Sequence, residues 1–89
     1  MNIVFMKNTF KNILCNRIKY LIKKHNMTAE MLAYQSGISK GGLSEILNCK
    51  KCPTSFTIAK ICAVFDITLK EFYNYKDFDE FIENLSIHS

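Results

Sequence analysis

The chain has 89 residues, of which 48% are hydrophobic and 22% charged, with three Gly and one Pro. This composition excludes a disordered tail protein, and the length is that of one domain. No apolar run is long enough to span a membrane, and the N-terminus lacks the basic start and small-residue cleavage site of a secretory signal. We therefore expect a cytoplasmic protein with no membrane partner.

A first helix is predicted from about Lys11 to His25, because apolar residues recur there at the spacing of one helical face. The apolar stripe consists of Leu14, Ile18, Leu21 and Ile22. Residues 1–10 are expected to be an N-terminal extension that precedes the folded domain.

The next stretch indicates two short amphipathic helices, Thr28–Gln35 and Ser39–Asn48, with the Thr and the Ser as N-caps. Gly37 lies between them and can adopt the left-handed conformation that ends one helix and turns the chain sharply. Ala33 is small at a point where a second helix must pass close by. This pattern is typical of a helix-turn-helix, whose second helix commonly reads nucleic acid.

Three further helices are predicted downstream. Pro53-Thr54 opens a fourth helix, and Thr68-Leu69-Lys70-Glu71 has the spacing of a capping box that starts a fifth. A last amphipathic segment carries an apolar face that consists of Phe78, Phe81, Ile82 and Leu85. The fold class is therefore all-α, with a helix-turn-helix domain over residues 11–75 and a C-terminal amphipathic helix or tail over residues 76–89.

Charge is unevenly distributed along the chain. Residues 1–60 hold ten Lys or Arg and two acids, a net charge of +8, whereas residues 61–89 carry −4. The basic part contains the predicted helix-turn-helix, as expected of a surface that meets phosphates. A basic face without any partner is the alternative, and it is common for Lys-rich helices.

From Arg17 to Phe72 the chain resembles the Cro/phage-repressor type of helix-turn-helix regulator, also called the xenobiotic-response-element type. The likeness is carried by Arg17-Ile18, Met27-Thr28, Leu32-Ala33, Ser36-Gly37-Ile38-Ser39, Leu43-Ser44, Ile46, Lys50, Pro53-Thr54, Thr57-Ile58, Lys60-Ile61-Cys62, Phe65 and Ile67-Thr68-Leu69-Lys70-Glu71-Phe72. The resemblance implies a compact five-helix lambda-repressor-like domain. It also implies that the protein binds operator DNA as a homodimer, with its third helix in the major groove.

By position in the family pattern, the base-contacting residues would be Lys40, Gly41, Ser44 and Glu45. The phosphate-contacting residues would be Ser39, Asn48, Lys50, Lys51 and Arg17. Lys40 would donate to guanine and Glu45 would accept from cytosine, although Glu45 could instead repel phosphates. For each of these residues the alternative is a solvated side chain.

Three departures from the family pattern weaken base reading. Ala29 replaces the Gln that often opens the second helix, and Gly41-Gly42 begin the reader helix, which should then fray. Ile22 and Leu47 stand where the family frequently pairs an Arg with a Glu, which suggests an apolar contact in place of an ion pair. We expect a modest ratio of specific to non-specific affinity, with steep salt dependence.

The four cysteines allow two minority readings. Cys49 and Cys52 have the C-x-x-C spacing of a zinc knuckle, but no second such pair completes four ligands, so no metal or other cofactor is expected. A thiol switch within this pair is slightly better supported, because Lys50 and Lys51 would favour the thiolate.

The sequence offers no catalytic constellation, so neither an enzyme nor a small-molecule substrate is expected. The leading hypothesis is a transcriptional regulator, most simply a repressor, that binds double-stranded DNA as a homodimer. The alternative is a protein-interaction or antitoxin-like module on the same fold. Candidates for dimerisation are Phe78, Phe81, Ile82 and Leu85, unless this face folds back onto the domain's own core.

Overall fold

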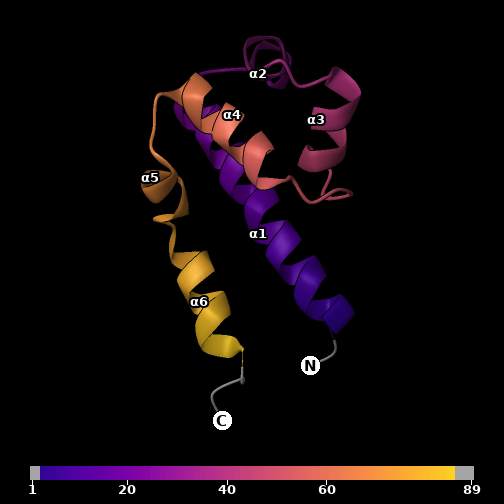
Figure 1. Ribbon diagram of the computed structural model, residues 1–89, viewed down its shortest axis with the longest axis vertical. Helices are drawn as coiled ribbons and strands as arrows, with labels where there is room; N and C mark the ends of the chain where they lie inside the picture. The colour runs from indigo at the N-terminus through magenta and orange to yellow at the C-terminus, as the bar shows by residue number, and fades with distance from the viewer. Residues whose placement is uncertain (1–2, 86–89) are drawn as a thin grey trace.

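The computed structural model describes residues 3–85, which contain six helices and no strand. In chain order the helices are α1 (Ile3–Lys24), α2 (Ala29–Ser36), α3 (Lys40–Leu47), α4 (Ser55–Phe65), α5 (Leu69–Tyr73) and α6 (Lys76–Asn84). The predicted all-α class is thereby confirmed. The helices α2, α3 and α4 surround the C-terminal half of α1, and α3 lies on the opposite side of the molecule from α5 and α6 (Figure 1).

Four of the six helices begin at a hydroxyl cap. Thr28, Ser39, Thr54 and Thr68 are extended, and each side-chain oxygen accepts a hydrogen bond from the backbone N–H three residues later, at 3.0–3.2 Å. Each cap satisfies one of the N–H groups that have no partner within the helix. The predicted starts of α2 to α5 are therefore confirmed.

The predicted start of the first helix is wrong, because α1 begins at Ile3 and not near Lys11. No Gly or Pro interrupts residues 3–24. The Phe10 ring also packs on α6, with ring-centroid distances of 5.7 Å to Phe78 and 5.2 Å to Phe81. The stabilisation from this long-range contact outweighs the poor helix propensity of the β-branched residues at the start of α1, so the helix is continuous.

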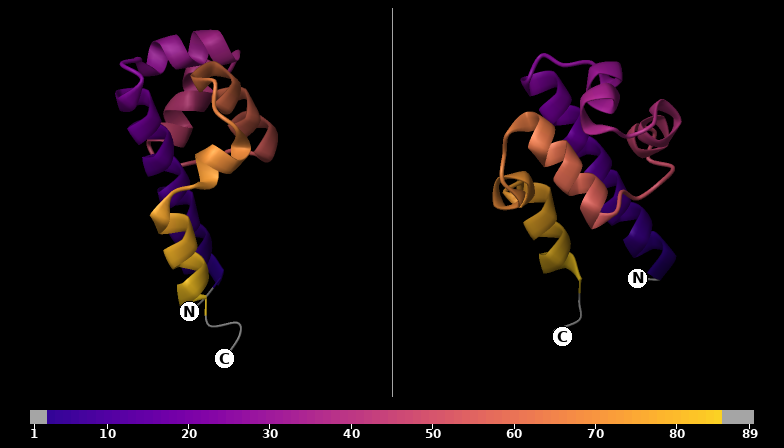
Figure 2. Two further views of the ribbon diagram at one scale, coloured as in Figure 1. Left: turned by 90° about the vertical axis from the view of Figure 1, so that its left-hand side faces the viewer. Right: turned by 45° about the horizontal axis from the view of Figure 1, so that its top comes forward.

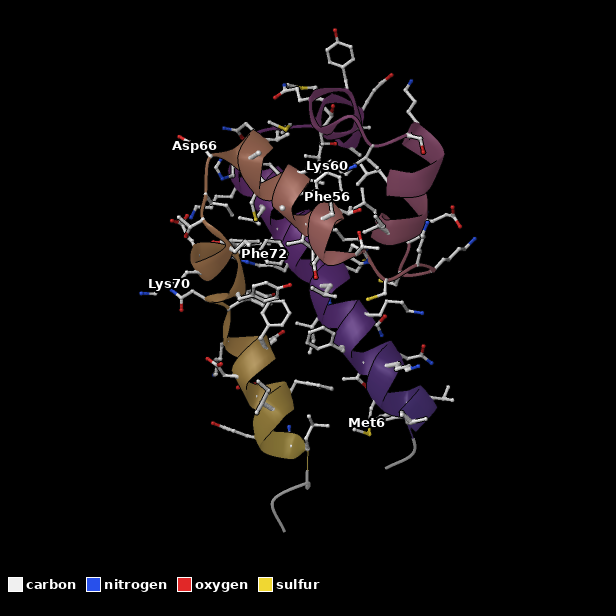
Figure 3. The ribbon with its side chains drawn as sticks, in the orientation of Figure 1. Met6, Phe56, Lys60, Asp66, Lys70 and Phe72 are labelled. Atoms are coloured by element: carbon white, nitrogen blue, oxygen red, sulfur yellow. The ribbon has the colours of Figure 1, made fainter. Side chains whose placement is uncertain are left out.

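The hydrophobic core surrounds α1 and draws on every helix. Its fully buried side chains include Leu14, Ile18, Leu21, Leu32, Leu43, Ile61 and Phe72. Figure 3 shows Phe72 directed from α5 toward α1. Ile22 and Leu47 are half-buried and each packs against this core.

Residues 3–13 of α1 and the antiparallel helix α6 extend beyond the other helices, and we call this pair the stem (Figures 1 and 2). Because of the stem, the molecule is elongated, with a longest dimension of 44 Å and other dimensions of 24 and 20 Å. Despite the length of α1, no helix within residues 3–85 combines the length and hydrophobicity needed to cross a bilayer.

The dimerisation face predicted on the last helix is partly wrong, because Phe78 is only 4% exposed. Its ring packs within the chain against Phe10, Phe72, Tyr73 and Tyr75. Phe81 and Leu85 are half-buried, and only Ile82, at 60% exposure, is open to solvent. Aromatic residues of the same chain lie next to Phe78, so its apolar surface is removed from water by packing within the chain.

Candidate nucleic-acid interface

The turn between α2 and α3 has the predicted geometry. Gly37 has φ +76°, and its N–H donates to the carbonyl of Ala33 at 3.1 Å, which ends α2 in a left-handed cap. Ala33 is 3% exposed, so its small side chain permits the close approach of the two helices. Ser39 then starts α3 by accepting from the Gly42 N–H at 3.0 Å.

Helix α3 has one buried and one exposed face. Leu43 and Ile46 are 1% and 4% exposed and attach the helix to the core. The exposed residues of α3 include Lys40, Gly41, Ser44 and Glu45, which are the four predicted base-contacting residues. The structure therefore places them together on the outer surface of α3, at the side of the molecule away from the stem helix α6 (Figure 1).

The segment after α3 presents three of the predicted phosphate-contacting residues. The backbone N–H groups of Lys50 and Lys51 both donate to the carbonyl of Glu45, at 2.9 and 3.2 Å. These bonds hold the loop against the C-terminal turn of α3, while both lysine side chains stay exposed. The amide of Asn48 donates to the Ser44 hydroxyl at 3.2 Å, so these two side chains are held as a unit.

A two-helix turn with an exposed second helix and a basic loop is found in several protein classes. The model of the Cro/C1-type HTH DNA-binding domain matches residues 17–77, about two-thirds of the chain. The chain belongs to this family. No curated protein and no solved structure shows a significant match to the chain. It is therefore a DNA-binding regulator of the Cro/C1 type.

In this Cro/C1-type domain Lys40 has a carboxylate partner that the sequence analysis missed. Its Nζ lies 2.6 Å from Oε1 of Glu30, which joins the first turns of α2 and α3. The hydrogen bond from Lys40 lowers the pKa of Glu30, so the carboxylate stays ionised. Both side chains are about three-quarters exposed, so the pair contributes little stability. Opposite charges in the first turns of two neighbouring helices were the available signal.

Arg17 does not occupy the place expected of a phosphate contact. It is 7% exposed, and its Nε and Nη2 donate to the carbonyls of Phe72 and Glu71 at 2.8 and 2.9 Å. The guanidinium also lies 5.0 Å from the Tyr75 ring centroid. The last carbonyls of the short helix α5 have no partner within the helix, and a planar multidentate donor satisfies them. Arg17 therefore holds α5 on α1.

Ala29 leaves a hollow between α2 and α3 in this domain. The hollow is lined by Ala29, Glu30, Ala33, Lys40, Leu43, Ser44, Leu47 and Asn48. A Gln at the position of Ala29 would project from the same turn of α2. With Ala29 at this position, no long polar side chain projects from that point of α2 next to α3.

The two glycines at the start of α3 differ in their surroundings. A Cβ on Gly41 would meet nothing within 4 Å, whereas a Cβ on Gly42 would lie 2.9 Å from Oγ of the capping Ser39. We expect Gly41→Ala to raise the free energy of unfolding by about 0.5 kcal/mol. Gly42→Ala should lower it by up to about 1 kcal/mol, because the cap must move. Urea denaturation followed by circular dichroism measures both, and equal effects would contradict this account of Gly42.

The position of Arg17 predicts a large loss of stability on truncation. Arg17→Ala removes two charge-assisted hydrogen bonds and leaves the Phe72 carbonyl without its donor, while the Glu71 carbonyl keeps the N–H of Asn74. The free energy of unfolding should therefore fall by about 2–4 kcal/mol. Arg17→Lys keeps the positive charge but loses the planar guanidinium with its several donors. It should therefore recover less than half of the free energy of unfolding that Arg17→Ala loses. Chemical denaturation tests this; a Lys variant as stable as the wild type would refute the role given to the guanidinium.

All four cysteines are free thiols. Within residues 3–85 no group of three or more His, Cys, Asp and Glu side chains converges on one point. Cys49 and Cys52, the pair with C-x-x-C spacing, differ in environment, because Cys49 is half-buried and Cys52 is exposed. Burial raises the pKa of Cys15 and of Cys62, so both remain protonated thiols near neutral pH.

Proposed function

We propose that this protein is a transcriptional repressor that occupies operator DNA with α3 in the major groove. The observation that carries the proposal is the exposed polar face of α3, next to a loop with two exposed lysines. The buried positions Leu43 and Ile46 hold α3 rigidly, so its outer face can enter the groove as a unit. Repression requires only that the operator be occupied.

The proposed contacts follow from the chemistry of each side chain. Lys40 donates to guanine O6 and N7 after it leaves Glu30, and Ser44 and Glu45 approach base edges further along α3. Lys50, Lys51 and Asn48 contact phosphates from the loop, and the free N–H groups at the start of α3, next to Ser39, contact another. Gly41 permits a close approach of the backbone.

A selection of bound genomic fragments, followed by a salt titration on the best fragment, tests the proposal. We expect log K to fall with log salt by about 0.9 per phosphate contact, and a specific-to-non-specific ratio near the low end of about 10³ to 10⁷. The ratio is low because Gly41 and Gly42 offer no side chain to the bases. No enrichment of any fragment, or binding that is insensitive to salt, would refute sequence-specific operator binding.

The pairing of Lys40 with Glu30 predicts a variant that binds DNA more tightly. Glu30→Gln removes a carboxylate close to the proposed phosphates and frees Lys40, so DNA affinity should rise by about 3- to 10-fold. Glu80→Gln is the matched control, because Glu80 also pairs with a lysine, Lys76, but lies on α6. Fluorescence anisotropy with labelled duplex measures both, and equal changes would contradict a role for Glu30 at the interface.

We further propose that a second copy of the chain docks on the stem. The free end of the stem exposes Ile3 at 66%, Val4 at 64% and Ile82 at 60%. Charge is complementary between the stem helices, because residues 3–13 carry lysines and no acids, whereas α6 is acidic. Within residues 3–85 the ion pairs are Lys40–Glu30 and Lys76–Glu80, so no pair joins the two stem helices. An antiparallel pairing of two stems would match these charges and cover the apolar ends.

Sedimentation equilibrium tests the homodimer. Ile82→Lys should weaken self-association by at least tenfold, because it places a charge in an apolar contact. Phe56→Lys is the control, since Phe56 is also exposed, at 72%, but lies on α4. A wild-type protein that stays monomeric in the presence of operator DNA would refute the dimer. If Ile82→Lys changes the cellular phenotype, Phe56→Lys does not, and both variants still bind DNA, the result would favour the protein-interaction alternative.

A further inference from the structure

Two of the free thiols meet where the C-terminal end of α3 packs against α1. Cys15, on α1, is 1% exposed, and its thiol donates to the carbonyl oxygen of Leu47 with an Sγ–O distance of 3.1 Å. Burial raises the pKa of Cys15, and a hydrogen bond with the Cys49 thiol raises it further. Leu47 precedes Cys49 by only two residues, so the 3.1 Å contact brings the segment of Cys49 next to the Cys15 thiol, although 34 positions separate the two cysteines in the sequence.

The backbone at Cys49 is held in an unusual conformation. Its φ is +58°, in the left-handed region that disfavours any residue with a β-carbon relative to Gly. Its N–H donates to the carbonyl of Ile46 at 3.1 Å, which anchors this conformation to the end of α3. Cys49 is half-buried, whereas Cys52 is exposed. The Cys15 thiol therefore lies next to the segment that carries Cys49, whereas Cys52 lines a hollow with Phe10 and Phe81.

We propose that Cys15 and Cys49 form a reversible oxidation site whose disulfide ties the α3–α4 loop to α1 and weakens DNA binding. The oxidant class is a peroxide. The Cys49 thiol first loses its proton, and the thiolate attacks a peroxide oxygen. The O–O bond breaks, the sulfenic acid forms, and the departing hydroxide takes up the proton lost by Cys49 to give one water. The Cys15 thiol then attacks the sulfenic sulfur, the S–O bond breaks, and the Cys15 proton leaves with the hydroxide as a second water. Two thiols are oxidised and one hydrogen peroxide is reduced.

The expected effect on DNA binding follows from the geometry. A disulfide is about 2.05 Å long, shorter than any non-covalent sulfur contact, so bond formation draws Cys49 toward α1. The adjacent residue is Lys50, a proposed phosphate contact. Oxidation also removes the hydrogen that Cys15 donates to the carbonyl of Leu47, the last residue of α3. Both changes act on the reader helix and its loop.

The test compares reduced protein with protein treated with hydrogen peroxide, and peptide mass spectrometry maps the disulfide. We expect a Cys15–Cys49 link in the wild type, reversed by dithiothreitol, and a fall from four free thiols to two. Cys52→Ser and Cys62→Ser should keep the link, and Cys49→Ser should lose it. Cys49 is half-buried in a loop, so its variant stays informative even if Cys15→Ser fails to fold. A dominant Cys49–Cys52 or intermolecular link would overturn the proposal.

The change in DNA affinity rests on the proposed function, whereas the disulfide map requires no DNA. Oxidised wild-type protein should bind duplex DNA at least threefold more weakly than reduced protein, and peroxide should not change the affinity of Cys49→Ser. An unchanged affinity after complete Cys15–Cys49 cross-linking would overturn the regulatory effect. Reduced protein that binds no DNA would count against the proposed function alone, provided that the link still maps to Cys15 and Cys49.

Discussion

Phe72→Ala is expected to lower the free energy of unfolding by about 3–5 kcal/mol, the range for truncation of a fully buried aromatic side chain. Phe72 is 0% exposed and packs edge-to-face against Tyr73 and at a tilt against Phe78, with ring-centroid distances of 5.0 and 6.2 Å. It therefore joins α5 to the cluster that holds α6. For a chain of this length the total stability is about 4–13 kcal/mol, so the loss is a large fraction of it.

Phe56→Ala is the matched control for this variant. Phe56 is 72% exposed on α4 (Figure 3). The Nζ atom of Lys60 lies 5.0 Å from the centroid of its ring. Loss of this exposed cation–π contact should cost at most about 1 kcal/mol. Urea denaturation followed by circular dichroism compares the two variants. Equal losses would show that Phe72 is not the centre of the packing between α1, α5 and α6.

The double variant Lys50→Glu/Lys51→Glu should weaken DNA binding by on the order of 100-fold at moderate salt, with a salt slope smaller by about two. Both side chains are exposed on the loop after α3, while their backbone N–H groups cap α3. The substitution therefore changes charge without removing the hydrogen bonds that hold the loop. Anisotropy titrations at several salt concentrations give both the affinity and the slope.

Lys70→Glu/Lys76→Glu changes the net charge by the same amount on the other side of the molecule. Lys70 projects from α5 away from the core (Figure 3), and Lys76 opens α6. This control should weaken binding by less than about tenfold, because it acts only through long-range charge that salt screens. Equal losses in the two double variants would mean that DNA responds to total charge and not to the loop.

Much of the site could be predicted from the sequence because its determinants are local. A hydroxyl cap, a left-handed Gly37 and apolar residues at helical spacing act within a few residues, so α2 to α5 begin where the sequence predicted. The grouping of Lys40, Ser44 and Glu45 on one face of α3 follows from the helical repeat itself. The contacts of these residues with DNA stay predictions. The division of the chain at residues 11 and 75 also stays a prediction, although residue 11 lies within the continuous helix α1.

The sequence by itself determined the all-α class, the helix-turn-helix and the basic face, since each depends on spacing and residue type along a short stretch. Only the tertiary structure decided that Arg17 holds α5, that Phe78 lies inside the chain, that Glu30 pairs with Lys40 and that the Cys15 thiol donates to the carbonyl of Leu47. Those outcomes depend on which helices pack together. Such packing brings together residues 10 to 68 positions apart, and their proximity lowers the free energy only once the whole core has formed.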